Sequence, residues 1–129
     1  MKFAYTIIYV TDVIKTAKFY TKAFGLELEF IPESKQYAQM KTGQTALAFV
    51  SEAHISQSGL TFTPNRTDQK CAGFVICLET NDVDSAFNHA VASGAKAIVE
   101  PCQKPWGQRV ASVSDINGVL VELCSPLTN

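Results

Sequence analysis

The sequence has little excess charge of either sign and no long hydrophobic run. Eleven Lys and Arg residues nearly balance twelve Asp and Glu residues, which gives a formal net charge of −1 over 129 residues. The basic residues form no stripe, so the composition argues against a nucleic-acid-binding protein. The apolar stretch at residues 3–10 is too short to span a membrane and has no small-residue cleavage site. We therefore expect a cytoplasmic protein without a membrane partner.

Motifs for metal binding and nucleophilic catalysis are also scarce. None of the four cysteines forms a Cys-x-x-Cys pair, and we expect no disulfide. Cys77 and Cys124 lie in apolar strand patterns, which predicts small buried side chains. The two histidines, His54 and His89, lie in a linker and on a predicted helix. No Gly-x-Ser-x-Gly elbow or Gly-rich phosphate loop occurs, so no motif supports nucleophilic catalysis.

An internal repeat is the strongest pattern that is present. Asp12-Val13 begins a helical pattern that ends at Gly25, and Asp82-Val83 begins one that ends at Gly94. The Asp-Val pairs lie 70 positions apart and the glycines 69 positions apart. Asp12, and Asn81 or Asp82, are the expected helix N-caps, and the glycines are the expected stops. Two copies of one structural unit explain this spacing.

Each copy is predicted to be a strand, a helix and three further strands. The predicted strands are residues 3–10, 26–31, 37–41 and 46–51 in the first copy and residues 72–78, 96–99, 108–114 and 119–124 in the second. The fold class is therefore α+β, with two tandem βαβββ modules whose curled mixed sheets surround a cavity.

We expect a single domain of residues 1–129, with module one at 1–51, a linker at 52–70 and module two at 71–129. The linker is longer than most connections in a compact domain. A short helix is predicted at 52–58. The segment is either a simple crossing between modules or a lid over a pocket.

The last predicted hairpin carries the most specific motif. Trp106-Gly107 leads into Asp115-x-x-Gly118-x-x-x-Glu122-Leu123. Together with the repeat, this resembles the vicinal oxygen chelate superfamily, which includes glyoxalase I, bleomycin-resistance proteins, fosfomycin-resistance enzymes and extradiol dioxygenases. The resemblance covers nearly the whole chain and implies the glyoxalase/bleomycin-resistance fold.

The resemblance also implies where a metal would bind. Metal-dependent members use four side chains, from the first and fourth strands of each module. The corresponding positions in this sequence are Tyr5, Ala48 (with Leu47 or Phe49 as neighbours in register), Phe74 and Glu122. Only Glu122 offers a good ligand, and one carboxylate cannot hold an ion in competition with water. We therefore expect no metal and no cofactor.

Glu122 is the only candidate catalytic residue. If the last hairpin pairs as its turn suggests, Arg109 lies on the same face, diagonally across from Glu122, so an ion pair between the two is one interpretation. Glu122 could instead bind a cationic or hydrogen-bonding group of a ligand, or act as a general base.

Aromatic side chains lie where the metal ligands would be, and aromatic faces hold flat ligands by stacking. They could equally fill the curled sheet, and Phe49 could face the helix. Trp106 would line either a pocket or a subunit interface. The predicted ligand-binding residues are Tyr5, Tyr9, Ala48, Phe49, Phe74, Trp106, Arg109 and Glu122.

The leading functional hypothesis is a metal-independent small-molecule-binding protein that sequesters a hydrophobic or aromatic compound. Bleomycin itself is not indicated, because the acidic residues are dispersed. One alternative is a glyoxalase-like lyase or isomerase, or a dioxygenase, with atypical metal ligation. Others are a metal-free catalyst that uses Glu122 and a dimeric partner whose pocket has collapsed. A homodimer is expected in every case, because open sheet edges need covering.

Overall fold

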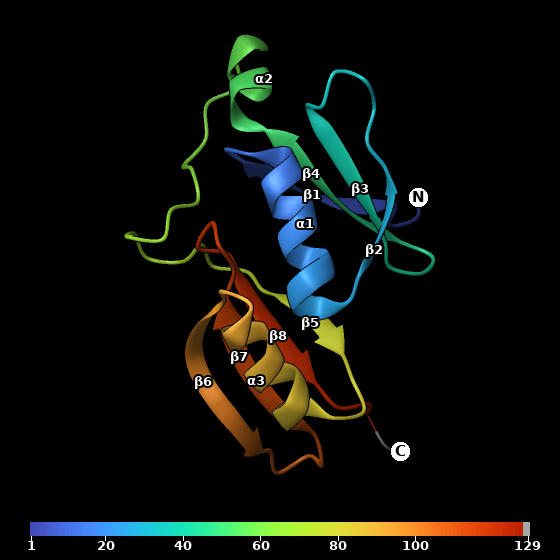
Figure 1. Cartoon of the computed structure of the whole chain (residues 1–129), viewed down its shortest axis with the longest axis vertical. Coiled ribbons are helices and arrows are strands. Elements are labelled where there is room, and N and C mark those ends of the chain that lie inside the picture. The colour runs from blue at the N-terminus through green and yellow to red at the C-terminus, as the bar shows by residue number, and fades with distance from the viewer. Residues whose placement is uncertain (128–129) are drawn as a thin grey trace. The chain divides into compact units, whose positions relative to one another are not determined.

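The computed structural model describes residues 1–127, and the chain divides into two compact units, Met1–Asn65 and Arg66–Asn129. Each unit contains one four-stranded sheet and one long helix, in the order βαβββ (Figure 1). The predicted α+β class with two tandem modules is therefore confirmed. Neither sheet closes on itself. The surrounding cavity stays a prediction.

The first unit is a mixed sheet with strand order β1-β4-β3-β2. β1 and β4 run parallel, and the other neighbours are antiparallel. Its elements are β1 (Tyr5–Val10), α1 (Val13–Phe24), β2 (Glu27–Phe30), β3 (Tyr37–Lys41), β4 (Ala46–Ser51) and the short helix α2 (Glu52–Gln57).

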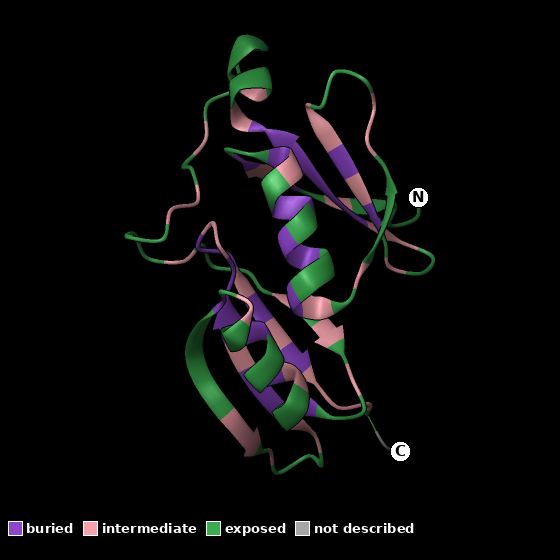
Figure 2. Ribbon diagram, viewed as in Figure 1, coloured by how far each residue is buried: buried purple, intermediate pink, exposed green. Residues whose placement is uncertain are grey.

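Helix α1 begins and ends where the sequence predicts. The Asp12 carboxylate accepts the Lys15 backbone N–H at 2.9 Å, and Gly25 ends the helix in the left-handed region at φ 70°. One side of α1 is buried and the other exposed, as the alternating colours in Figure 2 show. The buried side carries Tyr20, whose ring lies 4.8 Å from that of Phe49 on β4. This contact is part of the core of the first unit.

The second unit repeats the arrangement with strand order β5-β8-β7-β6, and β5 runs parallel to β8. Asp82, rather than Asn81, is the N-cap of its helix, since its carboxylate accepts the Ser85 N–H at 3.0 Å. The elements are β5 (Ile76–Glu79), α3 (Val83–Ala92), β6 (Lys96–Gln103), β7 (Arg109–Ser114) and β8 (Leu120–Cys124).

Two strands of the second unit differ from their predicted ranges. β5 begins at Ile76, so the predicted strand at 72–78 starts four residues too early. β6 continues to Gln103 rather than ending at Val99, and two register shifts interrupt its pairing with β7. β2 of the first sheet also has a register shift, between Leu28 and Phe30. β2 and β6 are edge strands, where bulges are common.

The predicted linker starts with the expected short helix. The Ser51 hydroxyl accepts the His54 N–H at 3.5 Å at the start of α2, and no helix or strand follows until β5. Among the described residues, no helix is long and apolar enough to cross a membrane.

Candidate functional site

Strand register divides the residues of the first sheet between two faces. Ile8 pairs with Phe49 and Ile7 with Ala48, so neighbouring positions alternate between the face that α1 covers and the opposite face. Because Phe49 contacts Tyr20 of α1, the helix-covered face is the one that holds Phe49. Tyr5, Ile7 and Tyr9 therefore lie on the opposite face, which we call the open face.

Aromatic rings gather on the open face of the first sheet. Tyr9 meets Phe62 edge-on with ring centroids 5.0 Å apart, and Phe30 lies 5.7 Å from Tyr37. The Tyr37 hydroxyl donates to Gln39 Oε1 at 2.7 Å. Burial, and more weakly the neighbouring Tyr5, raise the pKa of Tyr37, so its phenol stays neutral. We call Tyr5, Tyr9, Phe30, Tyr37 and Phe62 the aromatic cluster; its members come from three strands and the segment after α2.

Only some of the predicted ligand-binding residues of the first unit are accessible. Tyr5 is 52% exposed, and Tyr9 is partly covered by Phe62. Ala48 has the predicted parity but is fully buried. Phe49 is also fully buried, against α1, so the interpretation that it faces the helix is confirmed.

The open face of the second sheet carries a thiol and a carboxylate in contact. Cys77 pairs with Glu122 across β5 and β8, and the Cys77 thiol donates to Glu122 Oε2 at 3.0 Å. Burial, this hydrogen bond and the charges of Glu122 and Cys124 raise the pKa of Cys77 to about 12, so the thiol is protonated at neutral pH. Cys77 is nevertheless exposed, and the prediction of a buried side chain is wrong.

Arg109 does not pair with Glu122. The residue opposite Glu122 is Ser112, so Arg109 has the other parity and lies on the helix-covered face. There its Nε and Nη2 donate to the two carboxylate oxygens of Asp84 on α3, at 2.6 and 2.8 Å. The predicted Arg109–Glu122 ion pair is therefore wrong. The guanidinium holds the pKa of Asp84 below its usual range.

Phe74 and Trp106 are both exposed and lie outside the strands. Phe74 precedes β5 by two residues, so its predicted place on the first strand of module two is wrong. Trp106 lies in the β6–β7 turn, is 60% exposed, and donates its indole N–H to Gln108 Oε1 at 2.8 Å. Lys104 Nζ lies 6.0 Å from the centre of its ring.

The profile of the Glyoxalase/Bleomycin resistance protein/Dioxygenase superfamily matches residues 2–123. The chain belongs to this superfamily.

The similarity of this superfamily member to known proteins extends over nearly its whole length. It is 23% identical to the uncharacterized protein YraH of Bacillus subtilis (strain 168), over 95% of this chain and 97% of that protein. A glyoxalase-related enzyme from Fulvimarina pelagi has a TM-score of 0.82 at 16% identity, over 98% of this chain and 88% of its own. TioX from Micromonospora sp. ML1 has a TM-score of 0.71 at 23% identity, over 97% and 98%. At these identities the structural likeness shows the fold alone.

The register of the two sheets changes one of the positions at which the resemblance implies a metal ligand. The N-caps Asp12 and Asp82 lie 70 positions apart, as do Ile7 and Cys77, which pair with Ala48 and Glu122. The counterpart of Tyr5 is therefore Val75, not Phe74. The 69-residue spacing holds only after the helices, because one residue is missing between cap and glycine in the second copy.

Neither Val75 nor Phe74 has a side-chain atom that could bind a metal, so the set of metal donors at these positions is unchanged. Within residues 1–127, no three His, Cys, Asp or Glu side chains form a group that could hold a metal ion. Glu122 is the one carboxylate at these positions, and the Cys77 thiol occupies one of its oxygens.

Sequence reasoning missed three members of the aromatic cluster. Tyr37 was detectable, since alternation along β3 places it on the same face as Gln39, opposite Ala48. The bulge in β2 breaks the alternation that would have placed Phe30. Phe62 belongs to an irregular segment that has no periodic signal.

Proposed function

We propose that this superfamily member is a metal-independent binding protein that holds a hydrophobic or aromatic small molecule on the aromatic cluster. The observation that carries the proposal is the cluster itself, gathered on the open face of the first sheet. Aromatic faces bind flat apolar compounds by stacking and by burial of area. The Tyr5, Tyr9 and Tyr37 hydroxyls add a few polar groups that would orient such a ligand.

The donor set supports binding without a metal. Tyr5, Ala48 and Val75 offer no carboxylate, imidazole or thiolate to an ion. A metalloenzyme with atypical ligation would need donors from elsewhere in the chain. A metal-free catalyst that uses Glu122 is also less favoured, because the carboxylate already accepts a hydrogen bond from the Cys77 thiol, with 3.0 Å between Sγ and Oε2.

Elemental mass spectrometry of the purified protein, followed by calorimetric titration with divalent ions, tests the metal-independent part. We expect far less than one ion per chain and no binding heat. About one tightly held ion per chain, lost in Glu122→Gln, would return the protein to the metalloenzymes.

A thermal-shift screen with flat aromatic compounds tests the binding part. For a compound that raises Tm, Tyr5→Ala should weaken binding about tenfold, because one stacking partner is lost. Phe3→Ala is the matched control, since Phe3 is an exposed aromatic residue that precedes β1. Equal affinities of the two variants would contradict binding at the aromatic cluster.

The proposal includes a homodimer in the cytoplasm. β1 and β5 are edge strands of their sheets, and unpaired edges favour association with another chain. The four cysteines are free thiols, which suits a reducing compartment. Light scattering of the purified protein should give twice the 14.1-kDa mass of one chain. A monomer at micromolar concentration would contradict the dimer.

A further inference from the structure

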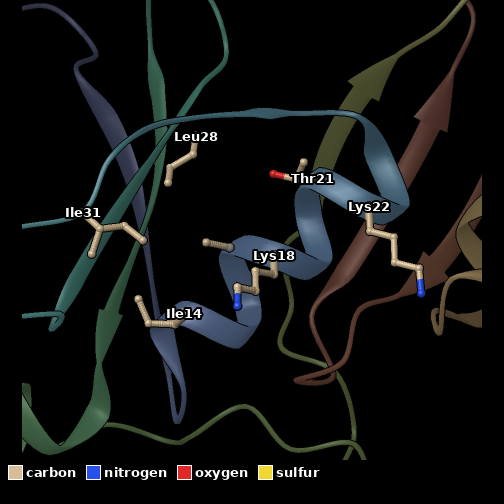
Figure 3. A pocket seen from close by; sticks show the side chains of 7 residues that line it. Ile14, Lys18, Thr21, Lys22, Leu28 and Ile31 are labelled. Atoms are coloured by element: carbon tan, nitrogen blue, oxygen red, sulfur yellow. The ribbon is translucent and has the colours of Figure 1, made fainter.

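A groove opens between α1 and the edge strand β2, on the helix-covered side of the first sheet. All four residues of β2 are exposed, and β2 lies farthest from β1 in the sheet order. Leu28 pairs with the buried Met40, so its side chain points toward α1, yet it stays 43% exposed. The resulting cavity is about 260 Å³ in volume. Its lining residues are Ile14, Ala17, Lys18, Thr21, Lys22, Leu28 and Ile31 (Figure 3).

The groove combines an apolar floor with a basic rim. Ile14, Leu28 and Ile31 supply aliphatic walls from the helix, the strand and the turn after it. Lys18 and Lys22 follow Ile14 at helical spacing, so the three share one side of α1. In Figure 3 the Lys18 ammonium lies beside Ile14, and the Thr21 side chain lies between the helix and Leu28. An amphiphile could bury its apolar part here and keep its polar head near the lysine.

The charges at this rim favour an anion. Glu27 on β2 is paired with Lys41 at 3.8 Å. In the described chain, Lys18 has no carboxylate within ion-pair distance. A charged donor binds a carboxylate through a charge-assisted hydrogen bond, which is stronger than a neutral one. The volume is just below the range of about 300–1,000 Å³ for drug-sized ligands, so a smaller molecule suits it.

We propose that this groove is a second binding site, for a small amphiphilic monocarboxylate. Its aliphatic chain or ring lies between α1 and β2, and its carboxylate meets Lys18 at the rim. The site is separate from the aromatic cluster, because α1 covers one face of the sheet and the cluster lies on the other. Binding here therefore does not depend on the proposed function.

Titration of the ¹⁵N-labelled protein with octanoate, below its micelle concentration, tests this proposal by NMR. Amide shifts should map to residues 14–22 of α1 and to β2. Lys18→Gln should weaken binding about three- to fivefold, as expected when one exposed charge pair is lost. Lys15→Gln, with the same charge change on an exposed position of the same helix, should leave the affinity unchanged.

Three outcomes would overturn the site. Shifts confined to β1, which carries Tyr5 and Tyr9, would assign octanoate to the aromatic cluster. Equal binding of octyltrimethylammonium would show a plain apolar groove without preference for an anion. Equal affinities of Lys18→Gln and the unmodified protein would remove Lys18 from recognition.

Discussion

The two sheets of this chain share one framework and carry different chemistry on their open faces. Asp12 and Asp82 cap equivalent helices, and equivalent parallel strand pairs bring Ile7 beside Ala48 and Cys77 beside Glu122. The open face of the first sheet carries aromatic rings, whereas that of the second sheet carries a thiol that is hydrogen-bonded to a carboxylate. The helix-covered face, which holds the buried core in both units, defines the fold. The two open faces differ, and the first of them holds the proposed binding surface.

The largest expected effect comes from truncating a large side chain on each helix-covered face. Phe49 on β4 and Leu123 on β8 are equivalent by register, since each pairs with a residue of the parallel first strand. Phe49→Ala should lower the free energy of unfolding by about 4 kcal/mol, and Leu123→Ala by about 3 kcal/mol. Urea denaturation measures both. Losses below about 1 kcal/mol would show that these faces do not define the fold.

The second test compares glycines in the equivalent turns of the two sheets. Gly43 and Gly118 have φ angles of 98° and 91°. A Cβ at Gly43 would meet nothing within 4 Å, whereas one at Gly118 would collide with the Arg66 carbonyl group. Gly43→Ala should cost about 1 kcal/mol from the backbone conformation alone, and Gly118→Ala about 3 kcal/mol. Equal losses of unfolding free energy in urea denaturation would mean that the backbone at Arg66 moves away from the added Cβ at no energetic cost.

The smallest test uses pH to separate the open faces. Folding raises the pKa of Cys77 from 9.0 to about 12, so its neutral thiol stabilises the fold fully below pH 9. This contribution is lost as the pH rises from about 9 toward 12, because the unfolded thiol ionises first. The free energy of unfolding should therefore fall over this range, and fall less in Cys77→Ser and in Glu122→Gln. Denaturant titrations at pH 8 and 10 compare the three proteins, and parallel curves would contradict the Cys77–Glu122 interaction.

The sequence predicts the framework well because local signals decide it. The Asp N-cap, the Gly25 stop and the apolar periodicity define α1 within a few residues, without information from elsewhere in the chain. The same kinds of signal predict α3. Strand ends are harder to predict, since β5 depends on a partner that is distant in sequence and β6 on an irregular pairing with β7.

The candidate site was harder to predict because it depends on parity and packing. An error of one position put Arg109 on the wrong face, although Asp84 on α3 was available as its partner. Cys77 has an apolar neighbourhood in sequence, but the open face leaves its thiol exposed beside Glu122. Phe62 enters the aromatic cluster through a segment with no regular structure.

The irregular pairing of β2 and β6 has a consequence for the aggregation of this chain. A regular edge ladder is a template onto which a foreign strand can add, and repeated addition leads to fibrils. β2 is bulged, and β6 is bulged and contains Pro101, which has no N–H to offer. These two edge strands are thereby poor templates for fibril growth. The regular edges β1 and β5 remain, so the proposed homodimer and aggregation would compete for the same two strands.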